Sequence, residues 1–258
     1  MKRAFRGVGL EIGRVNAASP DPRKLNPDIR DFEWETWQCV QPFTMTSMEA
    51  VIALIRAVEH VLRSGIPGDF VECGVWRGGS AMAIARTLAR SAEETRNLYL
   101  YDTFTGMVPP TDVDVSCDGE PAAHILSSLE RIAGERNEWA YATLEDVLSN
   151  LGQTALPRER IKIVQGPVER TIPATMPEQI AVLRLDTDWY ESTRHELAYL
   201  YPRLSRGGIL IIDDYGHWQG ARRAVDEYFG DKLPFLNRVD YTCRQAVKPD
   251  DNATRTKD

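Results

Sequence analysis

The stretch Ile180-Ala-Val-Leu-Arg-Leu-Asp186-Thr-Asp188 decides the fold class of this chain, because it is an apolar run that ends in acids. A second run, Gly207-Gly-Ile-Leu-Ile-Ile-Asp213-Asp214-Tyr215, repeats the pattern after a gap of helix length. In a parallel α/β sheet, buried strands are near-continuous runs of Val, Ile and Leu, and ligands bind beyond the carboxyl ends of the strands. The two stretches therefore predict neighbouring strands of a doubly wound α/β sheet, with four carboxylates at its ligand-binding edge.

The four carboxylates either stay apart or are joined by a metal ion. Acids that gather in a partly dry crevice without a cation repel one another strongly. A single Asp at a strand end is often only the N-cap of the next helix, but two such pairs on neighbouring strands favour a bound cation. The segment between the two runs, Tyr190 to Leu204, is predicted to be a helix.

A glycine-rich turn follows an earlier apolar run. Asp69-Phe-Val-Glu72-Cys-Gly74-Val-Trp-Arg77-Gly78-Gly79-Ser80 leads from a short strand through the glycines into a helix-forming segment at residues 81–88. Glycines let backbone amides approach a ligand closely, and a helix N-terminus favours a negative group. The spacing matches neither G-x-G-x-x-G nor the phosphate loop of nucleotide-binding proteins, so the turn indicates a ligand loop without identifying the ligand.

A further strand, residues 97–102, ends at Asp102. Nucleoside-binding α/β proteins place the acid that holds the ribose hydroxyls at about this position, so Glu72 and Asp102 are a candidate ribose clamp. The alternative interpretation is that Asp102 only opens the turn Asp102-Thr-Phe-Thr-Gly106. Residues 160–166 predict another strand, which ends in Gln165 and Gly166.

The chain is expected to form one domain with irregular ends. Its 258 residues, 43% of them hydrophobic, can bury one sizeable core. Residues 1–42 are predicted to be an irregular N-terminal arm, residues 43–247 the α/β domain, and residues 248–258 a disordered tail. Within the domain, residues 108–120 suggest a mobile loop that would serve as a lid over the crevice, and residues 235–247 suggest a closing β-hairpin.

The arm is also expected to carry one short helix near Asp31–Cys39. Its aromatic residues, Phe32, Trp34 and Trp37, are expected to pack on the body or on a partner subunit. A homo-oligomer is therefore the expected assembly.

Composition excludes several classes of function. A net charge of −7 and a pI near 5.3 argue against a nucleic-acid-binding protein. No stretch has the length of a membrane span, and the basic start lacks the apolar run of a signal peptide. The four cysteines are widely spaced with no CxxC pair, which favours a reducing, cytoplasmic location.

Three ordered motifs carry a resemblance to a known family. Val71-Glu-Cys-Gly-Val-Trp-Arg-Gly-Gly79, Leu185-Asp-Thr-Asp-Trp-Tyr-Glu-Ser-Thr193 and Ile212-Asp-Asp-Tyr-Gly216 closely resemble motifs of the macrocin O-methyltransferase (TylF) family, over about residues 43–228. The resemblance implies a Rossmann-like methyltransferase fold with a mostly parallel seven-stranded sheet and a C-terminal antiparallel hairpin. It also implies an enzyme that uses S-adenosylmethionine and Mg²⁺ to methylate a sugar hydroxyl of a glycoside.

The same resemblance implies a role for each motif residue. Asp186, Asp213 and Asp214 would bind the metal, and Asp188 would be the general base. Residues Tyr190, Tyr215 and His217 are placed to touch the substrate, although core packing or a plain loop role is the alternative for each. The candidate cofactor-binding residues are Thr44, Met45, Thr46, Glu72, Gly74, Arg77, Gly78, Gly79, Ser80, Asp102, Gln165 and Gly166.

Methyl transfer explains why these residue types belong together. An aliphatic hydroxyl is a poor nucleophile at neutral pH, and Mg²⁺ prefers oxygen ligands, so carboxylates plus substrate hydroxyls suit it. Asp186 and Asp188 project to one face if the strand continues that far. Asp213 and Asp214 are consecutive, so they serve one ion only if the strand has already ended.

Two other functions remain open at this stage. Asp186-Thr-Asp188 also resembles the D-x-D motif of metal-dependent glycosyltransferases, which bind nucleotide sugars. That motif leaves the Glu72 to Ser80 loop and the second acid pair unexplained. A non-catalytic protein that binds a cation and S-adenosylmethionine is the other alternative.

Overall fold

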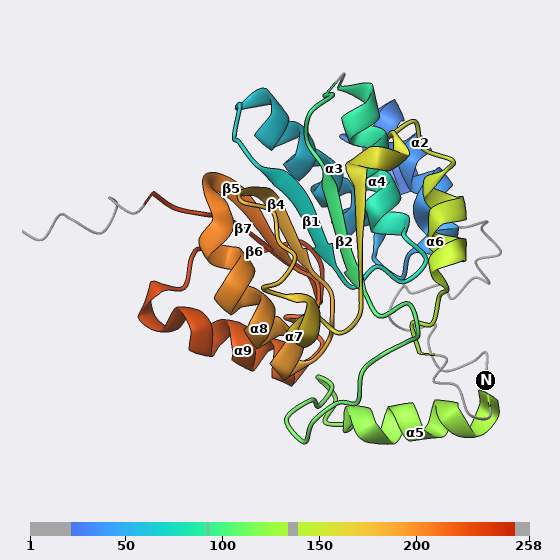
Figure 1. Cartoon of the computed structure of the whole chain (residues 1–258), viewed down its shortest axis with the longest axis vertical. Helices are drawn as coiled ribbons and strands as arrows, with labels where there is room; N and C mark the ends of the chain where they lie inside the picture. The colour runs from blue at the N-terminus through green and yellow to red at the C-terminus, as the bar shows by residue number, and fades with distance from the viewer. Residues whose placement is uncertain (1–21, 92, 134–138, 251–258) are drawn as a thin grey trace, which may run out of the picture.

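The computed structural model describes residues 22–91, 93–133 and 139–250. Their centre is a seven-stranded sheet with the order β3-β2-β1-β4-β5-β7-β6 (Figure 1). The strands β1 to β5 run parallel, whereas β7 is antiparallel to both β5 and β6. The strands are β1 (Asp69–Cys73), β2 (Leu98–Asp102), β3 (Ile161–Gln165), β4 (Ile180–Leu185), β5 (Leu204–Ile212), β6 (Asn237–Arg238) and β7 (Arg244–Val247).

Helices cover both faces of the sheet. The layer on one face comprises α2 (Asp31–Val40), α3 (Met48–Arg63), α4 (Gly79–Arg90) and α6 (Leu144–Leu151), and the layer on the other comprises α7 (Val168–Thr171), α8 (Tyr190–Leu200) and α9 (Gln219–Phe229). The short α1 (Pro22–Leu25) precedes α2, and α5 (Ala122–Ala133) stands apart from both layers (Figure 1). The predicted doubly wound α/β fold with a C-terminal hairpin is confirmed.

Successive side chains of each strand contribute to the two halves of the core, one on each face of the sheet. Phe70 and Val182 pack with α3 and α4, whereas Val71 and Leu183 pack with α8 and α9. Successive side chains of a strand point to opposite faces, so a strand that is apolar at every position must lie between two helical layers. All six residues of β4 are buried, as this arrangement requires.

A side chain close in the sequence caps the start of α3. The Ser47 side chain accepts a hydrogen bond from the backbone N of Ala50 (3.1 Å), which makes Ser47 the N-cap of α3 as predicted.

In the expected arm, α2 forms where the short helix was predicted, and Phe32 and Trp37 pack against the core beside α4. Residues 1–21 of the arm lie outside the described part of the chain.

The hairpin holds the chain to the sheet beyond β7. Lys248, assigned by the sequence analysis to the tail, exchanges backbone hydrogen bonds with Gly207 (2.9 Å) and Gly208 (2.8 Å). Of the tail expected at residues 248–258, residues 251–258 lie outside the described part of the chain. Within the described ranges, no helix combines the length and apolarity that crossing a membrane requires.

The order of the strands determines where a ligand site can lie. Strand β1 is flanked by β2 on one side and β4 on the other, both parallel to it. The chain therefore winds outward in opposite directions from the β1/β4 pair, which creates a crevice at their carboxyl ends. Glu72, Asp186 and Asp213 all lie in or directly after strands at this edge.

Candidate functional site

A cavity of about 280 Å³ lies at the carboxyl ends of β1, β2, β4 and β5. It brings together segments that are far apart in the sequence, including the turn before α3, the glycine loop, both acid pairs and the hairpin. Of the residues proposed from sequence, those that line it are Thr44, Met45, Thr46, Glu72, Gly74, Ser80, Asp102, Asp186, Asp188, Asp213, Asp214 and His217.

Three carboxylates converge in this cavity. Asp186, Asp188 and Asp214 each place one oxygen within 4.8 Å of the others. The chain has left strand geometry there: Asp188 adopts a left-handed backbone with φ of +65°, and its backbone N donates to Asp214 Oδ2 (3.0 Å). A turn, rather than a continued strand, therefore carries Asp188 to the other two acids.

The electrostatics of these acids favour a cation. Desolvation raises the pKa of Asp188 to about 6, with a further increase from the charge of Asp186. Desolvation and then the Asp188 charge raise the pKa of Asp214. Carboxylates that are costly to ionise together, and that offer only oxygen atoms, are suited to a hard divalent ion such as Mg²⁺.

Asp213 has a different partner from the one expected. Its Oδ1 lies 3.0 Å from Nη2 of Arg184, a buried arginine in β4. The pKa of Asp213 is still raised to about 7, because desolvation outweighs the Arg184 charge. The structure thus groups Asp188, and not Asp213, with Asp186 and Asp214.

The glycine loop is held tightly against the acid cluster. Gly74 has φ of +82°, and a Cβ there would lie 1.7 Å from the carbonyl oxygen of Asp186. A Cβ on Gly79 would lie 2.6 Å from Cβ of Thr44. Only glycine permits these close approaches, and they join the loop to Asp186 on one side and to the Thr44–Thr46 segment on the other.

Glu72 and Asp102 differ in how their oxygens are satisfied. Asp102 Oδ2 accepts from the backbone N of Val75 (2.7 Å) and Trp76 (3.1 Å), so it shapes the glycine loop. Glu72 is buried, desolvation raises its pKa to about 8, and its Oε2 has no hydrogen-bond partner within the described protein. A buried oxygen without a partner costs free energy, and a ligand with a donor group would satisfy it.

Several residues proposed from sequence lie away from the main cavity. Arg77 points to α6, where it pairs with Asp146 (2.8 Å). The Tyr190 hydroxyl donates to Glu227 (2.6 Å), and that of Tyr215 to Asp226 (2.8 Å). The remaining residues outside the main lining are Gly78, Gly79 and Gln165, with Gly166 beside a small neighbouring cavity of about 50 Å³.

The expected lid is fastened to the body by a residue that sequence analysis overlooked. Asp114 is fully buried, and it accepts hydrogen bonds from the Thr111 backbone N (2.7 Å) and, at its other oxygen, from the Tyr190 backbone N (2.7 Å). Ser116 also forms a β-bridge with Trp218. Residues 108–120 are thus tied to the starts of α8 and α9.

Aromatic side chains form a wall that the sequence analysis did not anticipate. Trp139 and Trp218 line the cavity with ring centroids 5.8 Å apart, and Trp189 packs behind Trp218 at 5.0 Å. Tyr241, which is 60% exposed, lines the mouth from the hairpin. No local pattern marks these residues, because they meet only after the fold has formed. Arg184 did carry a signal, a charge inside an otherwise apolar strand.

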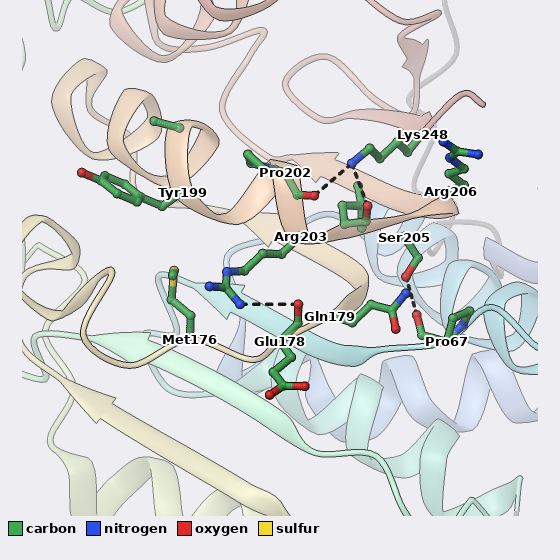
Figure 2. A pocket seen from close by; sticks show the side chains of 12 residues that line it. Pro67, Met176, Glu178, Gln179, Tyr199, Pro202, Arg203, Ser205, Arg206 and Lys248 are labelled. Atoms are coloured by element: carbon green, nitrogen blue, oxygen red, sulfur yellow. Dashed lines mark hydrogen bonds between the residues drawn. The ribbon is translucent and has the colours of Figure 1, made fainter. Parts of the chain in front are cut away.

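A larger hollow of about 1010 Å³ lies at the amino-terminal ends of β4 and β5 (Figure 2). Two of its basic side chains, Arg203 and Lys248, donate to backbone carbonyls. Arg203 donates to the carbonyl of Pro177 (3.0 Å), and Lys248 Nζ donates to those of Leu204 (2.7 Å) and Tyr201 (3.0 Å). These contacts hold β5 and the C-terminal segment in place.

Sequence comparisons relate this chain to known proteins. The family model described as macrocin-O-methyltransferase (TylF) matches residues 16–244. The 8-demethyl-8-(2,3-dimethoxy-alpha-L-rhamnosyl)-tetracenomycin-C 4′-O-methyltransferase of Streptomyces olivaceus is 36% identical over 210 residues, 81% of this chain and 73% of that protein. The mycinamicin III 3″-O-methyltransferase of Micromonospora griseorubida is 35% identical over 185 residues, covering 72% and 69%.

Solved structures also resemble this fold. The structure of the O-methyltransferase NovP aligns with a TM-score of 0.68 at 31% identity, and the alignment covers 81% of this chain and 83% of that one. The calicheamicin methyltransferase CalS11 aligns with a TM-score of 0.60 at 20% identity over 91% and 88%. The second likeness concerns the fold alone.

Proposed function

Because this chain belongs to the macrocin O-methyltransferase (TylF) family, we propose that it transfers a methyl group from S-adenosylmethionine to a hydroxyl of a sugar moiety, with Mg²⁺ in the acidic cluster. The observation that carries the proposal is the convergence of Asp186, Asp188 and Asp214 beside the glycine loop. The sequence-based expectation of an O-methyltransferase is confirmed by the family match.

The names of the relatives support a sugar acceptor. The Streptomyces olivaceus enzyme is named for 4′-O-methylation of a rhamnosyl-bearing tetracenomycin, and the Micromonospora griseorubida enzyme for 3″-O-methylation of mycinamicin III. Both names describe methylation of a natural product. We propose a glycoside or saccharide acceptor for this chain on that basis.

The residues present fit both a cofactor and a metal ion. Glu72 lines the cavity beside the glycine loop, and its unsatisfied Oε2 would accept from a donor on the methionine part of the cofactor. Asp186 and Asp214 belong both to the set expected from sequence and to the group that converges in the structure, so we propose them as metal ligands. A bound Mg²⁺ would lower the pKa of an adjacent substrate hydroxyl.

Asp188 is the proposed general base. Its pKa of about 6 leaves it mostly ionised at neutral pH, yet basic enough to accept a proton from an activated hydroxyl. Its backbone N is held by Asp214, which fixes the position of the carboxylate relative to the proposed ligands. Trp139 and Trp218 line the same cavity and would help to exclude water from it.

Methyl transfer to a glycoside panel tests this function. The protein is incubated with S-adenosylmethionine, MgCl₂ and rhamnosyl and other glycosides, and products are detected by a mass increase of one methyl group. Parallel reactions contain EDTA, or a nucleotide sugar in place of S-adenosylmethionine. Methylation that EDTA abolishes is expected. Sugar transfer from the nucleotide sugar, with no methylation, would instead support the glycosyltransferase alternative.

A further inference from the structure

Arg184 lies where the two halves of the site meet. Its Nη1 donates to Glu72 Oε1 (2.9 Å) and to Asp186 Oδ2 (2.6 Å). Its Nη2 lies 3.0 Å from Asp213 Oδ1 and donates to the Thr46 hydroxyl (2.8 Å). One guanidinium therefore contacts the glycine-loop strand, both acid pairs and the segment before α3.

Among the described residues, Arg184 is the cation that pairs with Glu72, Asp186 and Asp213. None of the described residues that line the cavity is Lys or Arg. Arg184 is 1% exposed in the middle of an apolar strand, directly beside Glu72 in the register of β1 and β4. A buried charge is tolerated only when it is paired and hydrogen-bonded, so Arg184 and its carboxylate partners depend on one another.

Two of these partners share the charge of the same nitrogen, whose two N–H groups can donate to both. Glu72 Oε1 and Asp186 Oδ2 both accept from Nη1, and the contact with Asp186 is the shorter. A divalent cation that binds Asp186 takes over part of the charge compensation that Nη1 now provides. More of the guanidinium charge is then available to Glu72, whose other oxygen has no hydrogen-bond partner among the described residues.

From this shared contact we propose that Arg184 is a positioning residue that couples metal binding to cofactor binding. The proposal rests on the proposed function, because it assumes that Glu72 faces the cofactor and Asp186 the metal. Metal on Asp186 strengthens the Arg184 to Glu72 contact and thereby orders the cofactor-binding acid. Coupling between two sites is reciprocal, so the cofactor also increases the affinity for the metal.

Calorimetric titration with S-adenosylhomocysteine measures the coupling directly. The wild-type protein is titrated in MgCl₂ and again after EDTA treatment, and the ratio of the two dissociation constants is the coupling factor. We expect a factor of about 5 or more in the wild type. Mn²⁺ titration followed by electron paramagnetic resonance, with and without S-adenosylhomocysteine, should give the same factor.

Arg184→Lys is the main variant, because an ammonium group keeps the charge but cannot bridge the same set of acceptors. We expect its coupling factor to fall to about 1. Arg160→Lys is the matched control: Arg160 is also a buried arginine, but it donates to the backbone carbonyl of Arg96 (2.8 Å) far from the site. This control should keep the wild-type factor.

A purely structural role for Arg184 would give a different result. It would lower the melting temperature and weaken both titrations equally, leaving the ratio unchanged. If Arg184→Lys does not fold, Glu72→Gln replaces the carboxyl group at the other end of the shared contact, and its factor should also fall to about 1.

The two proposals fail in distinguishable ways. Wild-type binding of S-adenosylhomocysteine with equal affinity in MgCl₂ and in EDTA would overturn the coupling and leave the proposed function standing. A wild-type factor that Arg184→Lys preserves would overturn the role of Arg184. The absence of any binding would overturn the proposed function itself.

Discussion

The two ends of β4 and β5 present opposite kinds of hollow. At the amino-terminal ends, the larger hollow is lined by Arg203, Ser205 and Lys248, which donate to backbone carbonyls (Figure 2). At the carboxyl ends, a cavity about a quarter as large contains acids that are close to one another and incompletely compensated. The volume of a cavity therefore predicts the functional site less well here than the presence of polar side chains that lack partners.

The difference between the two hollows has a physical origin. Backbone carbonyls satisfy Arg203 and Lys248 in the amino-terminal hollow, so binding a ligand to these two side chains would break existing hydrogen bonds. The carboxyl-end acids gain when a cation or donor arrives, because desolvation and mutual repulsion have raised their pKa values. A ligand that relieves this desolvation and repulsion therefore gains binding free energy in this cavity.

The largest expected effect comes from Asp188→Asn. Loss of the proposed base should reduce kcat by about 10³-fold, while S-adenosylhomocysteine binds with nearly unchanged affinity. Steady-state kinetics and calorimetry on the same preparation check this pair of results. Turnover at the wild-type rate would show that Asp188 is not the base.

Gly74→Ala should damage the carboxyl-end site through the backbone. The added methyl group would meet the Asp186 carbonyl oxygen at 1.7 Å, so the glycine loop and the acid turn must separate, at a cost of about 3 kcal/mol of unfolding free energy. Gly119→Ala is the matched control, because Gly119 has a similar φ of +88° and nothing within 4 Å of its Cβ position.

Urea unfolding and calorimetry distinguish these two glycine variants. We expect Gly119→Ala to lose only about 1 kcal/mol, the cost of the left-handed backbone for a residue with a Cβ, and to bind S-adenosylhomocysteine normally. Equal losses of stability and of binding in both variants would contradict the close approach at Gly74.

The acid cluster should make stability depend on pH in an unusual direction. The pKa of Glu72 is about 8 and that of Asp188 about 6, both above their ordinary values. Between pH 4 and 8 the folded state thus binds more protons at these groups than the unfolded state, so their contribution to stability falls as pH rises. Urea unfolding in EDTA should show this fall.

Magnesium should oppose this loss of stability. A cation compensates the ionised carboxylates, so adding MgCl₂ at pH 8 should raise the urea midpoint more than adding it at pH 5. An equal effect at the two pH values would argue against metal binding by the acid cluster.

The smallest effect is expected at the amino-terminal hollow. Arg203→Met removes hydrogen bonds to the Pro177 and Glu178 carbonyls and should cost about 1 kcal/mol of unfolding free energy. Turnover and S-adenosylhomocysteine affinity should stay within about twofold of wild type, within the normal range for a distant site. A large loss of turnover would show that the amino-terminal hollow also contributes to function.

Local patterns were sufficient to predict the fold. The apolar runs that precede Asp186 and Asp213 lie in the adjacent parallel strands β4 and β5, and Ser47 caps its helix. These features depend on residues close together in the sequence. The predicted meeting of the acid pairs at one edge also follows from parallel strands, which place their carboxyl ends together.

The details of the site required tertiary contacts. Asp188 reaches the other acids through a left-handed turn, and Asp213 is drawn to Arg184, which no spacing rule could foresee. Asp114 reads as one acid in a Pro- and Asp-rich loop, yet it is buried against the start of α8. In each case a partner distant in the sequence determines where the side chain points.

We propose that the carboxyl-end cavity is the cofactor and metal site of an O-methyltransferase. Calorimetric titration of wild-type protein with S-adenosylhomocysteine, before and after removal of divalent metal with EDTA, tests it most directly. The account predicts binding at one site per chain in both states, tighter with metal present. Failure to bind in either state would contradict it.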